Sequence, residues 1–149
     1  MKNMILSLTL LLTIGAAVAQ SEPVKLDLDL ANQMINKALA CGKENGWNLS
    51  VAVVNSEGNL MAFQRSELAF VGSIEVSIAK AKSSNAFQRP TKVFAEGVSG
   101  GNGGLVSLAG VVANAGGLPI KLNNIHSGAI GVSGATAAQD EQCAAIAIR

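Results

Sequence analysis

Basic side chains cluster around one short segment of the chain, residues 87–92, which joins two predicted helices. The cations near this segment are Lys80, Lys82, Arg89 and Lys92. Such a group can hold the carboxylates of a small anionic ligand, and Thr91 can add a hydroxyl and the N-terminus of a helix. The alternative is a solvated turn in which Thr91 is an ordinary helix cap. Residue types alone favour this alternative.

The chain has a single histidine, His126, which is flanked by Asn123, Asn124 and Ser127. A Ser-His-Asp triad could use a histidine, but the chain has no nucleophile elbow and nothing places an acid beside His126. Zinc binding is disfavoured as well, because one histidine and two distant cysteines do not make a ligand set. We therefore predict that His126 is a surface histidine in the turn between two strands.

Glycine is concentrated in one stretch: of the 16 glycines, 11 fall between Gly97 and Gly134. The run Gly100 to Gly104 does not match a phosphate-binding loop, because no Lys-Ser or Lys-Thr pair closes it. The later glycines do not match the dinucleotide-binding fingerprint either. The glycines instead separate three apolar runs, which we predict to be buried strands joined by tight turns: residues 105–108, 118–122 and 129–132.

An amphipathic helix is predicted at the start of the domain. It begins at Asp27 or Asp29 and ends near Gly42, and its buried face is formed by Ala31, Met34, Ile35, Ala38 and Leu39. Two apolar runs follow, residues 49–54 and 59–63, and the turn sequence between them favours a hairpin.

Three further helices complete the predicted set. Ser73 is predicted to cap a helix over residues 74–85, and Thr91 a short helix that ends near Val98. Residues 136–139 match a capping box at the start of the last helix. The order is helix, hairpin, two helices, three strands and helix. It predicts an α+β fold with a five-stranded antiparallel sheet, the N- and C-terminal helices packed on it, and two helices inserted after the second strand.

The first residues predict export. Residues 1–19 match a signal peptide, because Lys2 precedes an apolar run and Ala17-Val18-Ala19 follows it. The run is shorter than the roughly 20 residues of a membrane span, which disfavours the alternative of an anchor. We therefore expect a periplasmic or secreted protein without a membrane anchor after cleavage, composed of a flexible arm, residues 20–27, and a single domain, residues 28–149.

The charge balance limits the partners of the protein. The chain has 11 basic and 10 acidic residues, and removal of Lys2 with the signal peptide leaves 10 of each. A nucleic-acid surface needs a basic excess, so we expect no nucleic-acid partner. Charged residues make up only 14% of the chain. A surface this poor in charge, at a net charge near zero, favours association into a homo-oligomer.

Two cysteines, Cys41 and Cys143, lie in the first and last predicted helices. An exported protein allows them to form a disulfide, if the two helices pack side by side on one face of the sheet. The alternative is a pair of buried free thiols, because the sequence does not show how closely their Cα atoms approach. Both possibilities stay open at this point.

Several motifs together resemble the HbpS-like haem-binding or haem-degrading proteins, which include the GlcG proteins of glycolate-utilisation operons and the C-terminal domain of PduO-type proteins. The resemblance extends from about residue 28 to residue 145. The motifs are residues 51–60, residues 73–82, Arg89-Pro90-Thr91, Gly116-Gly117-Leu118-Pro119-Ile120, and residues 128–134 leading to Gln139-Asp140. Together they are specific, although each alone is weak.

The resemblance implies a profilin-like fold that assembles into dimers or larger oligomers, and haem binding in some members. Carried over, Thr91 would lie at the metal, and Arg89, Lys82 and Arg65 would be propionate partners, the last three on the basis of their charge. The leading hypothesis is thus an exported protein that binds haem or a related anionic tetrapyrrole. The alternatives are an enzyme or accessory protein that acts on a small hydroxy or oxo acid, with His126 as acid-base group, and a structural oligomeric module.

Overall fold

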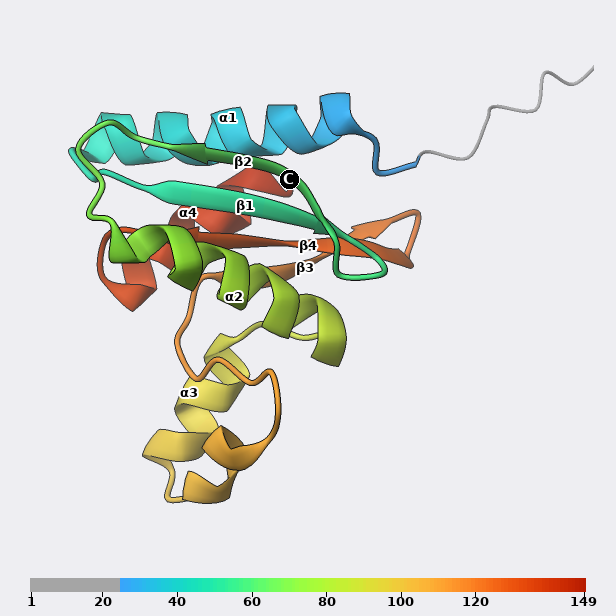
Figure 1. Cartoon of the computed structure of the whole chain (residues 1–149), viewed down its shortest axis with the longest axis vertical. Coiled ribbons are helices and arrows are strands. Elements are labelled where there is room, and N and C mark those ends of the chain that lie inside the picture. The colour runs from blue at the N-terminus through green and yellow to red at the C-terminus, as the bar shows by residue number, and fades with distance from the viewer. Residues whose placement is uncertain (1–24) are drawn as a thin grey trace, which may run out of the picture.

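The computed structural model describes residues 25–149, in which helices cover both faces of an antiparallel sheet (Figure 1). The elements are α1 Leu28–Asn45, β1 Ser50–Asn55, β2 Leu60–Arg65, α2 Gly72–Phe87, α3 Lys92–Ser99, the 3-10 helix η1 Gly103–Ser107, β3 Gly117–Leu122, β4 Ile125–Ser133 and α4 Ala137–Ala147. The predicted signal peptide and residues 20–24 of the predicted arm lie outside the described residues. Among the described helices, none has both the length and the apolarity of a membrane span.

The sheet has four strands in the order β2-β1-β4-β3, and every neighbouring pair is antiparallel. The last strand of the chain therefore lies beside the first, with Val51 opposite Val132 and Val53 opposite Ile130. The α+β class, the hairpin and the helices at both ends of the chain are confirmed.

The predicted fifth strand, residues 105–108, is wrong, since most of this run lies in η1. No residue of η1 is buried, so the apolar side chains of this run do not contribute to the core of the sheet. Leu105 instead packs over Gly97 of α3, where a Cβ atom would clash with it. Together α3 and η1 project away from the sheet on the side opposite α1 (Figure 1).

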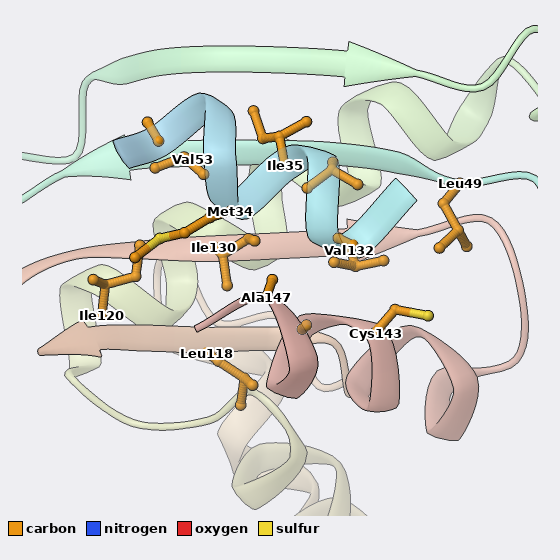
Figure 2. Close-up of a cluster of buried hydrophobic side chains, with 14 of the residues drawn as sticks. Met34, Ile35, Leu49, Val53, Leu118, Ile120, Ile130, Val132, Cys143 and Ala147 are labelled. Carbon is orange, nitrogen blue, oxygen red and sulfur yellow. The ribbon is translucent and has the colours of Figure 1, made fainter. Parts of the chain in front are cut away.

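The main core lies between the sheet and the two terminal helices. Strand residues that face α1 and α4 alternate with residues that face α2, so Val51 and Val53 belong to one cluster and Ala52 and Val54 to the other. Figure 2 shows the larger cluster, in which Met34 and Ile35 of α1 lie over the strands. The smaller cluster lies under α2.

The structure shows which of the predicted capping residues begin and end the helices. Asp27 caps α1 through a hydrogen bond from the Leu30 N–H, and the capping box at Thr136 is confirmed. Gly42 does not end α1, because Gly46 takes the left-handed conformation that closes it. Leu26, within the predicted arm, is buried in the core, so packing begins ahead of α1.

A disulfide joins Cys41 of α1 to Cys143 of α4, with their Cα atoms 5.6 Å apart. The two helices therefore pack side by side on one face of the sheet, which resolves the two possibilities that the sequence left open. The bridge closes a loop of 102 residues. In the chain-entropy account, a loop of this size stabilises the folded state by about 4 to 5 kcal/mol.

Candidate functional site

The predicted basic segment lies where α2 ends and α3 begins, which we call the α2–α3 junction, residues 87–92. Gln88 takes a left-handed conformation, with φ 50°, and ends α2. The hydroxyl of Ser84 donates a hydrogen bond of 2.9 Å to the carbonyl of Arg89, which fixes the turn. Pro90 cannot continue α2, because proline has no backbone N–H to donate. The chain therefore turns into α3 at once.

Three of the predicted cations are exposed: Lys82 in α2, and Arg89 and Lys92 in the junction. Lys82 lies in α2, and Arg89 follows Gln88, the residue that ends this helix, so both cations lie towards the same end of α2. Lys92 lies 3.6 Å from Glu96, in an exposed pair that solvent screens. Lys82 and Arg89 form no ion pair with any acid within residues 25–149. These two cations are the ones that remain available to an anion.

Lys80 does not belong to the surface cluster, and its prediction as a member is wrong. Its side chain is only 1% exposed, and its Nζ donates hydrogen bonds of 2.8 Å to Asp140 Oδ2 and 3.0 Å to the carbonyl of Val132. Helical spacing placed Lys80 on the same helix as Lys82 but gave no sign of its partner, which is 60 residues further along the chain.

The buried pair connects helices on opposite faces of the sheet, α2 and α4. Burial lowers the pKa of Lys80, and the hydrogen bond and charge of Asp140 oppose that shift. Burial likewise raises the pKa of Asp140, against the hydrogen bond and charge of Lys80. The other carboxylate oxygen of Asp140 accepts a hydrogen bond of 2.9 Å from the Ala135 N–H. Each charge is thus satisfied, although both lie in the interior.

Two adjacent glycines make room for this pair at the start of β3. A Cβ atom on Gly116 would lie 2.9 Å from Cβ of Asp140 and 3.0 Å from Nζ of Lys80. A Cβ atom on Gly117 would lie 2.5 Å from the carbonyl oxygen of Lys80 and 2.6 Å from Cγ2 of Thr91. The Gly116-Gly117 motif is therefore explained by close packing around Lys80 and Thr91.

Thr91 is fully buried, and its hydroxyl is engaged twice. Oγ1 donates a hydrogen bond of 2.6 Å to the carbonyl of Asn114 and accepts one of 2.9 Å from the Gly117 N–H. The Thr91 N–H donates in turn to the carbonyl of Gly117 at 2.9 Å. Thr91 precedes α3, but its side chain makes no capping hydrogen bond, so that prediction is wrong. The hydroxyl instead ties the start of α3 to the segment before β3.

Arg65 lies apart from the other predicted ligand residues. It ends β2, and its Nη2 donates to the carbonyl of Glu67 at 3.3 Å. The strand residue opposite it, Ser50, contacts Ser73 at the beginning of α2. Arg89 follows the end of α2, and a helix of 16 residues is about 24 Å long. One chain therefore does not bring Arg65 and Arg89 together.

His126 lies within β4, so its prediction as a surface residue of the turn is wrong. Asn123 and Asn124 form that turn, with φ of 51° and 63°. The ring of His126 is half-buried beside the last turn of α2, where Nε2 is 2.8 Å from Asn85 Oδ1. Nδ1 is buried without a hydrogen-bond partner. Within residues 25–149, no group of three or more His, Cys, Asp or Glu side chains could hold a metal ion.

A separate hollow of about 430 Å³ lies near the beginning of α2 and was not predicted from the sequence. Its apolar lining comes chiefly from Trp47, Leu68 and Phe70, and the start of α4 closes one side. Trp47 thus lines a surface hollow in addition to its packing against the core. The hollow and the α2–α3 junction lie at opposite ends of α2, so they are distinct sites.

Comparison with known proteins identifies the family of the chain. A family model described as "Haem degrading protein HbpS-like" matches residues 26–149. Protein GlcG of Escherichia coli (strain K12) is 33% identical over 114 residues, which cover 74% of this chain and 85% of GlcG.

Two solved structures share the fold. Klebsiella pneumoniae protein ORFY has a TM-score of 0.77 and 30% sequence identity, and the match covers 89% of this chain and 95% of ORFY. A complex of PduOC with haem has a TM-score of 0.77 and 26% identity, and the match covers 84% of this chain and 94% of PduOC. Sequence and structure agree, and the chain belongs to the HbpS-like/GlcG family.

Proposed function

We propose that the protein binds haem or a related anionic tetrapyrrole at the α2–α3 junction. The observation that carries this proposal is the pair of exposed cations, Lys82 and Arg89, which have no acidic partner within residues 25–149. The similarity to PduOC, which was solved with haem, supports the ligand class. A guanidinium and an ammonium group near the same end of a helix can each pair with one propionate carboxylate.

The surface beside these cations suits the apolar part of a tetrapyrrole. Phe87 is half-buried, and its ring packs edge-on against Phe94 with the ring centroids 5.1 Å apart. Val93 is exposed in the first turn of α3. A flat apolar ring can cover these side chains while its carboxylates reach the cations. Ligand sites commonly combine an apolar lining with a few polar groups in this way.

The predicted iron contact of Thr91 fits less well. Its hydroxyl already makes two hydrogen bonds inside the protein, which supports a role in positioning the junction. Arg65 would pair with a propionate only if a second copy of the chain brought it near, because it lies at the other end of α2. Lys82 and Arg89 are thus the proposed carboxylate partners on one chain.

We also propose that the protein is exported, to the periplasm or outside the cell, and that it forms a homo-oligomer. The pattern of residues 1–19 and the Cys41–Cys143 disulfide both suit an oxidising compartment. The low content of charged residues supports association. Cell fractionation and light scattering of the purified mature protein test these two points.

A haem titration followed by the Soret band tests the binding proposal. We expect saturation near one haem per chain, and Lys82→Ala/Arg89→Ala should weaken binding by about tenfold or more, because it removes two charge-assisted hydrogen bonds. The matched control is Lys37→Ala/Lys43→Ala, which removes two exposed cations of α1 across the sheet. Absence of a saturable spectral change, or equal losses in both variants, would overturn the proposal.

A further inference from the structure

We infer that this site recognises the carboxylates and ring of a tetrapyrrole without a bond from the protein to iron, so that metal-free porphyrins are ligands as well. The inference rests on the proposed function and specifies its ligand class. Within residues 25–149, each side chain that could otherwise ligate the iron is hydrogen-bonded, disulfide-bonded, buried or packed against the core.

Thr91 is the first candidate, and its hydroxyl is not free. The single proton of Oγ1 goes to the carbonyl of Asn114 at 2.6 Å, and the Gly117 N–H occupies an acceptor position at 2.9 Å. The residue is also 0% exposed. The hydroxyl could reach iron only if Thr91 left the interior, which would cost both hydrogen bonds and leave the buried Gly117 N–H without its partner.

The side chains that usually ligate haem iron are His, Cys, Met and Tyr. The chain has no tyrosine, and Cys41 and Cys143 form the disulfide. Met34 is in the core, and Met61 packs against the same core from the edge strand β2. The two remaining methionines, Met1 and Met4, belong to the predicted signal peptide.

His126 is the last candidate. Its Nδ1 is buried, and its Nε2 is 2.8 Å from Asn85 Oδ1. The amide of Asn85 is held in turn, because Nδ2 donates to the carbonyl of Ser56 at 3.1 Å. A second copy of the chain would bring the same residues with the same hydrogen bonds. An oligomer of this chain therefore adds no new type of iron ligand.

The side chains that remain available do not discriminate metals. Lys82 and Arg89 bind carboxylates through charge and hydrogen bonds, and Val93 offers apolar contact. Haem and protoporphyrin IX share the same propionates and the same ring edge. Their affinities should therefore be similar, whereas a protein–iron bond would favour haem alone.

Parallel titrations of the wild-type mature protein with haem and with protoporphyrin IX test this inference without depending on a variant that must fold. We expect the two dissociation constants to agree within about threefold, and Lys82→Ala/Arg89→Ala to weaken both to the same extent. A haem affinity more than about thirtyfold above that of protoporphyrin IX would overturn the inference while leaving the proposed function intact. If neither compound binds saturably, the proposed function fails, and the inference fails with it.

The variant His126→Asn tests separately whether the imidazole ligates iron. The substitution removes the imidazole, and the absorption spectrum of bound haem should stay unchanged if no imidazole ligates iron. A shift of the Soret band in His126→Asn, with circular dichroism matching the wild type, would identify His126 as an iron ligand and overturn the inference.

Discussion

Two oxygen atoms, Asp140 Oδ2 and the carbonyl of Val132, meet Nζ of Lys80 in the interior. Each ion of such a buried pair has lost its hydration, and the attraction of its partner offsets the free energy of that loss. Removal of one partner leaves an uncompensated charge in the interior. Removal of both leaves no buried charge. The pair should therefore respond very differently to single and double substitution.

Lys80→Met should lower the free energy of unfolding by about 3 to 5 kcal/mol, because it leaves the Asp140 carboxylate buried without its counter-charge. The double variant Lys80→Met/Asp140→Asn should recover about half of this loss or more. Its amide is neutral and can still accept the hydrogen bond from the Ala135 N–H. Urea unfolding followed by circular dichroism measures both. Equal losses in the two variants would contradict the explanation.

The cost of Lys80→Met should also depend on pH. Burial raises the pKa of Asp140 above 3.8, and in this variant the hydrogen bond and charge of Lys80 no longer oppose the shift. A carboxyl with a raised pKa binds its proton more tightly in the folded state. The stability that this gives is fully present below 3.8 and is lost as the pH rises through the folded-state pKa.

The difference in unfolding free energy between Lys80→Met and the wild type should therefore shrink as the pH falls from about 7 towards about 4. Urea unfolding of both proteins at a series of pH values measures this difference. Lys80→Met/Asp140→Asn is the matched control, because its residue 140 does not titrate. A difference that stayed constant over this range would show that Asp140 does not take up a proton in the variant.

At the scale of the elements, the segment before β3 is shaped by what it packs against. Gly117→Ala places a Cβ atom 2.5 Å from the Lys80 carbonyl and 2.6 Å from Cγ2 of Thr91, so backbone has to move. We expect a loss of about 1 to 3 kcal/mol, typical of overpacking. Gly103→Ala is the matched control, because its Cβ atom would meet nothing within 4 Å. Similar melting temperatures for the two variants would refute this account.

The disulfide joins the two helices that cover one face of the sheet. Cys41→Ser/Cys143→Ser should lower the unfolding free energy by about 4 to 5 kcal/mol, since the bridge closes a loop of 102 residues. Thermal unfolding with and without a reductant measures the loss. The reductant should destabilise the wild type and leave the double variant unchanged. A wild type that is insensitive under denaturing conditions would mean that the bridge does not form.

Helices and the hairpin could be predicted because their signals are local. The buried face of α1, the turn after β1 and the Thr136 capping box all lie within a few residues of the structures they specify. The strand predicted at 105–108 failed because an apolar run does not show whether a sheet edge is available to it. The burial of Lys80 could not be predicted either, since Asp140 is 60 residues away.

The site shows the same contrast. The junction between α2 and α3 and its exposed cations followed from helix spacing and from Pro90, and the family motifs identified the same segment. The sequence could not show that Thr91 is sealed by Asn114 and Gly117, because those contacts depend on how distant segments pack. Sequence therefore indicates which residues are charged and near one another, and packing determines which of them a ligand can reach.

For the whole molecule, the balance of charge determines how an anion is attracted. The chain has 11 basic and 10 acidic residues, so no large net charge steers an anion from a distance. Attraction must come from the local cations at the α2–α3 junction. Charges at a surface are screened beyond about 10 Å at 0.1 M salt and beyond about 3 Å at 1 M salt.

Binding of protoporphyrin IX should therefore weaken as salt is raised from about 0.05 M to about 0.5 M, by several-fold, because salt screens the carboxylate–cation pairs. Lys82→Ala/Arg89→Ala should lose most of this salt dependence, and Lys37→Ala/Lys43→Ala should keep it. Fluorescence titrations at each salt concentration measure the slope. If the Lys82/Arg89 variant kept the wild-type slope, the carboxylates would have to be bound elsewhere on the protein, and the hollow beside Trp47 and Phe70 would be the next place to test.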